Sequence, residues 1–391
     1  IITIYRSPFS VEEEMGPPAF PPSSMPSPLL YLHLPFCKVR CSYCPFAVET
    51  DDRLQERYVA ALTQELRSRC GGGRFSTLYL GGGTPSRMRP DLLNRLFGEL
   101  RFLQFEQGAE ITIEANPEDV TEEAVERWLS LDINRVSLGV QSMHDDELVP
   151  LGRQHGRAGA ISALRLAREA GFRISADLMI GLPGQTPESF AESLRLIVNH
   201  GVTHLSMYIL DLEEGTSLQR QISSGRTVLP DDDFVAGMYR DAVGTAAEAG
   251  LRQYEISNFA KPEQESHHNL GYWNGTPYLG IGMSAHSYDG AERTGNSKSL
   301  LEYVERLEQG GEATTFRERL TVQELREERL FLQLRQAAGI GYSELTALCG
   351  KEGVEWIDRG KRDGWLESAG ERVHFTVDGY LLSNEFISQL F

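Results

Sequence analysis

The feature that most limits the fold of this chain is a repeated alternation of strand-like and helix-like segments that begins at residue 29. Residues 29–34 form an apolar run, residues 53–69 follow with a helical period, and residues 76–80 have the pattern of the next strand. Because strands that alternate with helices form parallel sheets, this pattern predicts an α/β protein. The loops at the carboxyl ends of such strands usually carry the functional residues. Further strands are predicted at residues 110–114, 134–140, 173–180, 204–209 and 253–257, and a further helix at residues 155–170.

The pattern changes after residue 300. Charged helical segments are predicted at residues 321–337 and 342–349, and strand-like residues follow at 364–366 and 373–377. This mixture predicts a small helix-plus-wing domain. With 391 residues the chain is long enough to bury a large core and to add such a domain. We therefore expect a core domain at residues 29–300 and a C-terminal accessory domain at residues 301–391.

The first 28 residues differ in composition from the rest. They hold seven of the 18 prolines and a run of three glutamates at residues 12–14, a composition that cannot easily bury a core. We expect residues 1–28 to be a flexible, proline-rich leader. Its acids and few arginines disfavour an organellar transit peptide.

Hydropathy and charge disfavour two classes of function. No segment approaches the roughly 18 uninterrupted apolar residues that a membrane-spanning helix needs. The formal net charge of −18 would repel a nucleic-acid backbone, which binds through clustered Lys and Arg. We therefore expect a soluble, cytoplasmic protein that does not bind nucleic acid.

Three of the five cysteines, Cys37, Cys41 and Cys44, fall within eight residues. This spacing is too crowded for a disulfide framework. Three thiolates spaced in this way can bind three irons of a cubane [4Fe-4S] cluster and leave the fourth iron open. Zinc is the weaker interpretation because no fourth cysteine lies close by, and three unrelated buried cysteines are the remaining alternative. Thiolates that hold iron also indicate a reducing compartment.

Polar and glycine residues follow several predicted strand ends. Gly81-Gly82-Gly83-Thr84 comes directly after residues 76–80, and glycines there let backbone amides approach a small anionic or zwitterionic ligand. A plain tight turn is the alternative. Four charged or amide residues also follow predicted strand ends, and each of them taken singly is most simply a solvated surface residue. Because the strand ends meet at one edge of a parallel sheet, we expect these residues to converge there: Glu114, Gln141, Arg153 and Asp177.

The segment Cys37-Lys-Val-Arg-Cys41-Ser-Tyr-Cys44 resembles the signature of the radical-SAM superfamily. Its lead-in, Tyr31-Leu-His-Leu-Pro-Phe-Cys37, is similar to the branch that contains oxygen-independent coproporphyrinogen III oxidase and the HemW-type haem chaperones. The resemblance runs from about residue 29 to the C-terminus. It implies a partial (β/α)6 barrel with a small C-terminal helical or winged accessory domain like that of HemN. It also implies that the cluster holds S-adenosylmethionine.

The resemblance further implies contacts to S-adenosylmethionine. It places the glycine segment at the amino group of the methionyl end, and the four polar residues at the ribose, carboxylate and sulfonium. Arginine suits a carboxylate through its planar fork, and carboxylates suit ribose hydroxyls and a sulfonium charge. Tyr31 and Tyr43 resemble positions that line the cofactor, although both could be core residues. The implied contact set is Tyr31, Tyr43, Gly82, Gly83, Thr84, Glu114, Gln141, Arg153 and Asp177.

One position separates the two close relatives. The oxidase carries a further cysteine two residues after the third, where this chain has Phe46. A phenyl ring cannot replace a thiol, so the oxidase activity is disfavoured. The chaperone relatives resemble this chain at that position.

A second segment favours the chaperones. His268-Asn-Leu-Gly-Tyr272-Trp273 matches a His-Asn-x-x-Tyr-Trp pattern associated with haem-binding relatives, and imidazole is a common axial ligand of haem iron. The alternative is that His268 forms hydrogen bonds within a polar loop and that the aromatic residues are core. His267 and His286 are other candidate ligands.

These observations predict a radical-SAM haem chaperone that binds a [4Fe-4S] cluster, S-adenosylmethionine and haem, and that transfers haem to an acceptor protein. No catalytic residue is assigned. An electron donor and a second copy of the chain are the other expected partners. The alternative is an oxygen-independent coproporphyrinogen III oxidase. A structural iron–sulfur protein without S-adenosylmethionine is disfavoured by the glycine segment and the polar residues at the strand ends.

Overall fold

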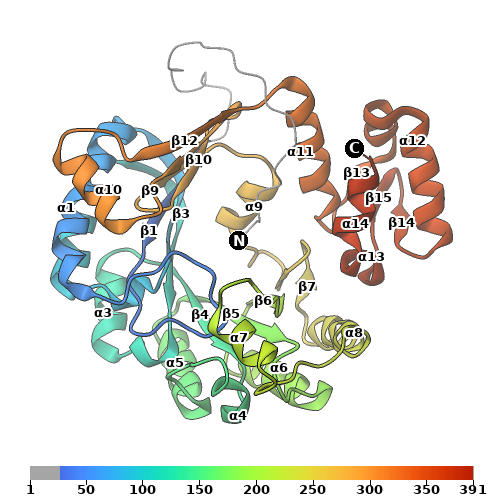
Figure 1. Ribbon diagram of the computed structural model, residues 1–391, viewed down its shortest axis with the longest axis horizontal. Coiled ribbons are helices and arrows are strands. Elements are labelled where there is room, and N and C mark those ends of the chain that lie inside the picture. The colour runs from blue at the N-terminus through green and yellow to red at the C-terminus, as the bar shows by residue number, and fades with distance from the viewer. Residues whose placement is uncertain (1–26, 391) are drawn as a thin grey trace.

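The computed structural model describes residues 27–390, and its largest element is a twelve-stranded sheet (Figure 1). The strand order is β12-β11-β10-β9-β1-β2-β3-β4-β5-β6-β8-β7. The first six strands pair in parallel and in chain order, as a partial (β/α)6 barrel requires. The predicted α/β class is therefore confirmed. These strands are β1 (Leu29–Leu34), β2 (Arg74–Gly82), β3 (Gln104–Ala115), β4 (Arg135–Gln141), β5 (Arg173–Ile180) and β6 (His204–Ile209).

Helices between the strands form the outer layer (Figure 1). Their apolar stripes explain this position: α2 buries Leu92, Leu93, Leu96 and Leu100 in the main core. The long helices are α1 (Gln55–Cys70), α2 (Pro90–Leu100), α3 (Glu122–Ser130), α5 (Arg157–Glu169), α6 (Pro187–Asn199) and α8 (Asp232–Glu248). The short ones are η1 (Asp52–Leu54), η2 (Pro85–Arg87), η3 (Pro117–Asp119), α4 (Asp145–Leu148) and α7 (Ser217–Ser223).

The strands of the barrel are apolar on one face and polar on the other. Leu30, Leu32 and Leu34 of β1 are fully buried in the main core, whereas Tyr31 and His33 line a cavity. Side chains alternate between the two faces of a strand, so every second residue points to the same side. The inner face of the barrel thus presents polar groups to one enclosed space.

The predicted strand at residues 253–257 is wrong. The structure has two short antiparallel strands instead, β7 (Arg252–Gln253) and β8 (Asn258–Ala260). The chain reverses between them, because Tyr254 N donates to Asn258 O (3.0 Å) and Asn258 N donates to Glu255 O (3.3 Å). Apolar alternation in a short segment does not distinguish one strand from a tight hairpin.

Beyond β8 and α9 (His267–Trp273), a meander completes the large sheet. Tyr303 and Val304 of α10 are fully buried in the main core. Residues 301–319, which we expected in the accessory domain, therefore lie in the large sheet and its helical layer, since α10 packs in the main core and β12 pairs with β11. The meander contains β9 (Tyr278–Ile281), β10 (His286–Tyr288), β11 (Glu292–Asn296), α10 (Leu300–Glu308) and β12 (Thr314–Arg319).

A second apolar cluster forms around Leu330, Trp356, Phe375 and Phe386 at the C-terminal end. α12 bends at Gly350, where the backbone has φ 59°, and this explains why the sequence predicted a helix only as far as residue 349. The strands pair in the order β13-β15-β14. The elements are α11 (Val322–Leu334), β13 (Ile340–Gly341), α12 (Tyr342–Arg362), β14 (Leu366–Ala369), β15 (Arg372–Phe375), α13 (Val377–Leu381), α14 (Ser383–Ile387) and η4 (Ser388–Leu390).

The predicted leader, residues 1–28, lies outside the described residues except for its last two. Within residues 27–390, no helix combines the length and the apolar character that crossing a membrane requires.

Candidate functional site

The cysteine loop, residues 37–44, follows β1 directly. Its first residue is fixed because Cys37 N donates to Glu49 O (2.8 Å), and its end is a tight turn in which Cys44 N donates to Cys41 O (3.2 Å). Ser42 N donates to Leu151 O (3.0 Å), which ties the loop to the segment after β4. All three cysteines are half-buried free thiols. The loop therefore presents three thiols from one short, anchored turn.

The surroundings of these thiols disfavour free thiolates and suit thiolates that are bound to a metal cluster. The pKa of Cys37 is raised to about 11, first by burial, although a hydrogen bond with Thr84 lowers it. Burial also raises the pKa of Cys44. A metal favours thiolates in such surroundings because it supplies the missing positive charge. In the described part of the chain no three His, Cys, Asp or Glu side chains are arranged to hold one metal ion; a cubane cluster makes a different demand, because each thiolate binds its own iron.

The glycine segment, Gly81–Thr84, lies directly against the cysteine loop. Gly83 N donates to Leu34 O (2.9 Å) and Thr84 N donates to Phe36 O (3.0 Å). The Thr84 hydroxyl lies 3.3 Å from Cys37 Sγ. A side-chain carbon on Gly83 would lie 2.4 Å from the carbonyl carbon of Pro35, so only glycine permits this approach. The two motifs that the sequence kept 37 residues or more apart thus form one backbone-lined cradle.

Arg153 connects the cysteine loop to the ends of β3 and β4. Its guanidinium lies 3.6 Å from Cys41 Sγ and donates to Asn116 Oδ1 (2.7 Å) and to the carbonyl of Gly139. Gln141 is buried beside it: a side-chain carbon at Gly139 would lie 2.9 Å from Arg153 Nη2 and 3.1 Å from Gln141 Nε2. Gln141 has φ 63° in an irregular stretch of β4, and such backbone strain is typical of functional positions.

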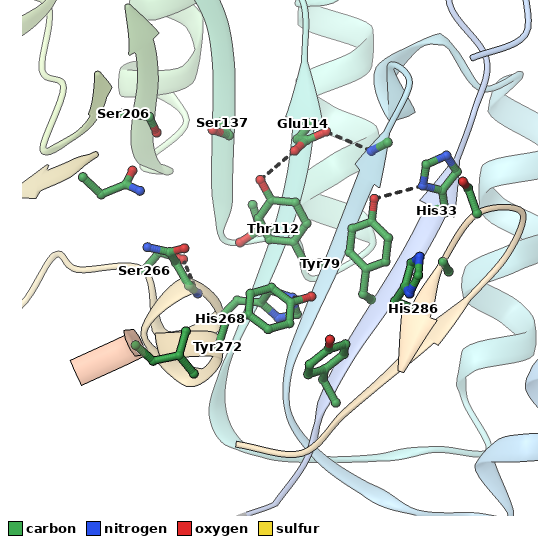
Figure 2. A pocket seen from close by; sticks show the side chains of 18 of the residues that line it. His33, Tyr79, Thr112, Glu114, Ser137, Ser206, Ser266, His268, Tyr272 and His286 are labelled. Carbon is green, nitrogen blue, oxygen red and sulfur yellow. Dashed lines mark hydrogen bonds between the residues drawn. The ribbon is translucent and has the colours of Figure 1, made fainter. Parts of the chain in front are cut away.

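Glu114 and Asp177 are two half-buried acids, of which Glu114 lies near the end of β3 and Asp177 in the middle of β5. Glu114 accepts hydrogen bonds from the Tyr79 hydroxyl (2.8 Å) and from Gly82 N (3.1 Å), as Figure 2 shows. Burial raises the pKa of Glu114 to about 7, and the charge of Asp177 adds to this. Burial likewise raises the pKa of Asp177 to about 6. A cationic group bound between them would favour both carboxylates.

The two tyrosines of the predicted contact set lie in different surroundings. Tyr31 lines the cavity, its hydroxyl lies 3.1 Å from His33 Nδ1, and its ring stacks on Tyr79. Tyr43 packs against a small apolar cluster that includes Leu151.

A cavity of about 360 Å³ opens inside the barrel and continues to α9 and α11 (Figure 2). Gly82 and Glu114 line it at one end, and His268 and Tyr272 line it further along. Phe46 also lines it, with 39% of its surface exposed. The volume is within the usual range of small-molecule sites. The predicted cofactor segment and the predicted haem-binding segment therefore share one cavity.

His268 lies in the wall of this cavity with both ring nitrogens in hydrogen bonds. Nδ1 lies 2.7 Å from the Thr77 hydroxyl and Nε2 lies 3.0 Å from the Tyr272 hydroxyl. The ring stacks on Tyr79 at 4.9 Å. Burial lowers the pKa of His268 to about 3, so its imidazole is neutral at pH 7.

A buried ion pair holds the helix that carries His268. Glu110 accepts hydrogen bonds from the Ser266 hydroxyl (3.0 Å) and from His268 N (3.1 Å), at the beginning of α9. Arg135 Nε donates to the same carboxylate at 2.9 Å, and both side chains are buried. A carboxylate at a helix N-terminus satisfies free amides and complements the helix dipole.

Most of the polar residues inside the barrel were not predicted from the sequence. Their signal was present, because polar residues recur with period two within predicted strands that are otherwise apolar. Tyr79 matters most, since it contacts both Glu114 and His268. The missed residues that line the cavity include Tyr79, Thr112, Ser137, Ser175, His204 and Ser206.

Comparisons with known proteins agree with this architecture. The family model described as the radical SAM superfamily matches residues 31–197. The heme chaperone HemW of Bacillus subtilis (strain 168) is 34% identical over 366 residues, which cover 91% of this chain and 97% of that protein. The radical S-adenosyl methionine domain-containing protein 1, mitochondrial, of Mus musculus is 35% identical over 342 residues, which cover 84% of this chain and 77% of that protein. The structure of coproporphyrinogen III oxidase (HemN) from Escherichia coli, a radical SAM enzyme, matches with a TM-score of 0.82 at 26% identity and covers 93% of this chain and 90% of its own.

Proposed function

Because the chain belongs to the radical SAM superfamily and, within it, to the HemW family of haem chaperones, we propose that it binds haem and transfers it to an acceptor protein. The observation that carries this proposal is the shared cavity, which runs from the glycine segment to the segment of His268. Aromatic rings of Tyr31, Tyr79 and Tyr272 face this space, and flat aromatic surfaces suit a tetrapyrrole.

The residues at the barrel mouth fit a [4Fe-4S] cluster and S-adenosylmethionine. Cys37, Cys41 and Cys44 would each bind one iron, and the glycine segment beside them packs on Pro35 through Gly83 and lines the cavity through Gly82. When bound, the cluster and S-adenosylmethionine supply the capacity for radical chemistry. The chain itself binds and orients them through Thr84, Glu114, Gln141, Arg153, Asp177 and the ring of Tyr31, and Tyr43 supports the cysteine turn.

His268 is the ligand that the resemblance implies for the haem iron. Its imidazole is neutral, as an iron ligand must be, but ligation through Nε2 requires the Tyr272 hydroxyl to release that nitrogen. A small rotation of Tyr272 would suffice, because its hydroxyl has no other hydrogen bond partner among the described residues. His268 therefore stays our proposed ligand from the resemblance.

Partners must reach the cysteine loop and the cavity. Val39 and Phe46 beside the cysteines are 43% and 39% exposed, and such apolar groups suit contact with another protein. We propose that an electron donor, the haem acceptor or a second copy of the chain contacts this surface, in the cytoplasm.

The second candidate function is oxygen-independent coproporphyrinogen III oxidase. The likeness to HemN over most of the chain favours it. Phe46, which stands where the oxidase carries a fourth cysteine, opposes it.

An anaerobic comparison of two activities tests the proposal. The reconstituted protein is titrated with haem and, separately, assayed with coproporphyrinogen III, S-adenosylmethionine, a reductant and an electron acceptor. We expect stoichiometric haem binding and no protoporphyrinogen. Sustained formation of protoporphyrinogen would instead establish the oxidase.

The cluster ligands are tested by Cys41→Ala, which should remove the iron–sulfur absorbance. Cys349→Ala is the matched control, because Cys349 is a half-buried free thiol outside the cysteine loop. A Cys41→Ala protein that kept all of its iron would refute the ligand set.

A further inference from the structure

Four histidines line the cavity, and His286 differs from His33, His204 and His268 because its imidazole has no hydrogen bond partner among the described residues. It begins β10, and neither of its ring nitrogens has a hydrogen bond partner within residues 27–390. We propose that the imidazole of His286 is an axial ligand of the haem iron when haem occupies the cavity. This inference rests on the proposed function, because it assumes that haem is the ligand of the cavity.

The imidazole of His286 is seated rather than mobile. Its ring lies over Gly295 of the neighbouring strand: a side-chain carbon there would lie 3.0 Å from Cε1 and 3.2 Å from Nδ1. Phe316 of β12 packs against the ring at a centroid distance of 6.2 Å. Burial, with the charges of Lys298 and Arg293, lowers the pKa of His286. A neutral imidazole can bind iron without first losing a proton.

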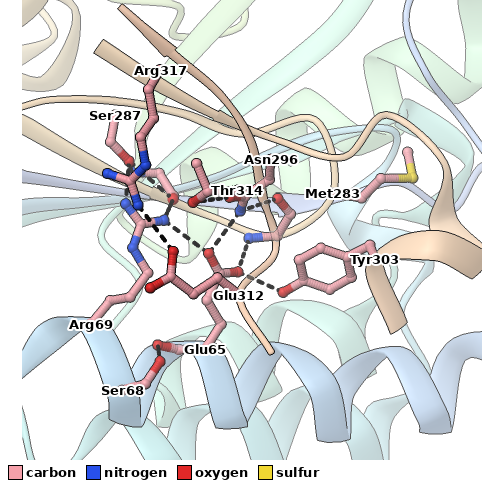
Figure 3. Close-up of polar contacts among 12 residues, drawn as sticks. Glu65, Ser68, Arg69, Met283, Ser287, Asn296, Tyr303, Glu312, Thr314 and Arg317 are labelled. Atoms are coloured by element: carbon pink, nitrogen blue, oxygen red, sulfur yellow. Dashed lines mark hydrogen bonds and ion pairs between the residues drawn. The ribbon is translucent and has the colours of Figure 1, made fainter. Parts of the chain in front are cut away.

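The loop before His286 is held in an unusual backbone conformation. Gly282 has φ 109° and Ser284 has φ 61°, and a non-glycine residue with positive φ persists only where its surroundings impose it. Glu65 of α1 imposes it: its carboxylate accepts hydrogen bonds from Gly282 N (2.9 Å), Asn296 Nδ2 (2.7 Å) and the Tyr303 hydroxyl (2.6 Å), as Figure 3 shows.

A second anchor acts on the same loop from α1. The Tyr58 hydroxyl donates to His33 O (2.6 Å) and accepts from Met283 N (3.0 Å). The loop is thereby fixed to β1, whose Tyr31 and His33 line the same cavity. The two anchors thus fix Gly282 and Met283, shortly before His286, as is expected where a side chain must be held in position.

The two histidines differ in what iron binding would cost. His268 already has two hydrogen bonds, so ligation breaks one of them. His286 has none, so ligation through Nε2 breaks no hydrogen bond, and Nδ1 stays buried against Gly295. Figure 2 shows both residues on the cavity wall, with His286 on the side of His33.

A haem titration of the full, reconstituted chain tests the inference. Ferric haem is added to the wild-type protein, to His286→Ala and to His286→Met, with the Soret and visible bands recorded at each step. We expect His286→Ala to weaken haem binding at least tenfold and to change the bands, and free imidazole to restore them. His286→Met should shift the bands to those of a thioether ligand. His267→Ala is the matched control, because His267 is exposed and lies outside the cavity lining, and it should leave binding unchanged.

The outcomes separate this inference from the function on which it rests. Failure of the wild-type protein to bind haem would overturn the proposed function. If wild-type haem binding is normal and both His286 variants keep its bands and affinity, the His286 assignment is wrong while the function stands. The thermal unfolding midpoint of each variant shows whether it is folded, and His286→Met retains a large side chain in case the smaller one destabilises the loop.

Discussion

Gly83→Ala tests whether the glycine segment and the cysteine loop depend on each other. The added carbon would lie 2.4 Å from Pro35 C, 2.5 Å from Pro35 O and 2.9 Å from Phe36 N. Carbon atoms in contact normally lie about 3.5–4.0 Å apart. Because all three obstructing atoms belong to the backbone, no side chain can rotate away. The loop that leads to Cys37 must therefore move.

The size of the effect follows from the contacts that this movement disturbs. Overpacking of a tight site costs about 1–3 kcal/mol. Two backbone hydrogen bonds join the segments, from Gly83 N to Leu34 O and from Thr84 N to Phe36 O, and each contributes about 0.5–1.5 kcal/mol. We therefore expect the free energy of unfolding to fall by about 2–4 kcal/mol.

Gly98→Ala is the matched control. Gly98 lies in α2, and a side-chain carbon there would meet no atom within 4 Å. Alanine is more favourable than glycine in a helix by up to about 1 kcal/mol. The same substitution should therefore stabilise the chain at residue 98 and destabilise it at residue 83.

Two measurements check the prediction: urea unfolding of the apo chain, and iron and sulfide content after anaerobic reconstitution. Gly83→Ala should show both reduced stability and reduced iron, while Gly98→Ala takes up as much iron as the wild type. Full iron content and wild-type stability in Gly83→Ala would refute the argument that the two segments form one cradle.

Two further predictions concern buried charges. Glu110→Gln should lower the free energy of unfolding by about 3–5 kcal/mol, because it leaves Arg135 buried without its ion pair; Glu99→Gln, at an exposed ion pair, should cost less than about 1 kcal/mol. Equal losses in the two unfolding curves would contradict this. Burial raises the pKa of Glu255 to about 7 from 4.5, so its contribution to stability is present below the unfolded pKa and is lost as pH rises through about 7. The wild type should lose up to about 3 kcal/mol relative to Glu255→Gln between pH 5 and pH 8, and parallel stability–pH curves would exclude the effect.

Buried polar groups are concentrated inside the barrel for a physical reason. A strand exposes one face to the apolar helical layer and the other to the interior, so the interior is free to carry polar residues if they satisfy one another. Glu114, Tyr79 and His268 do so through a hydrogen bond and a stacked ring pair. The pKa of Glu114 is nevertheless raised, because burial still disfavours its charged carboxylate. A cationic ligand group would offset that cost, which supports the proposed cofactor site.

Local patterns in the sequence predicted much of the fold. The bounds predicted for β1, β5 and β6 match the structure residue for residue, because apolar residues recur at every second position along each of them, as the pleat of a half-buried strand requires. The hairpin at residues 252–260 was missed, since alternation in so short a segment is the same for one strand and for a reversal held by two backbone hydrogen bonds. The sequence also did not indicate that the strands after residue 277 join the large sheet.

The sequence by itself determined the parts of the site that depend on short spacing. Three cysteines within eight residues must come from one loop, and a glycine segment after a strand must lie at the strand end. Both conclusions follow from chain connectivity, which limits how far neighbouring residues can separate.

Only the tertiary structure decided which distant side chains meet. Arg153 lies beside Cys41 across 112 residues of sequence, Glu65 holds the loop before His286, and both nitrogens of His268 are already in hydrogen bonds. No local pattern encodes these contacts, because they form only when the sheet curves and brings its strand ends and the later meander to one cavity. The sequence favoured His268 as the haem ligand, whereas the fold shows that His286 is the cavity-lining histidine whose ring nitrogens both lack a hydrogen bond partner among the described residues.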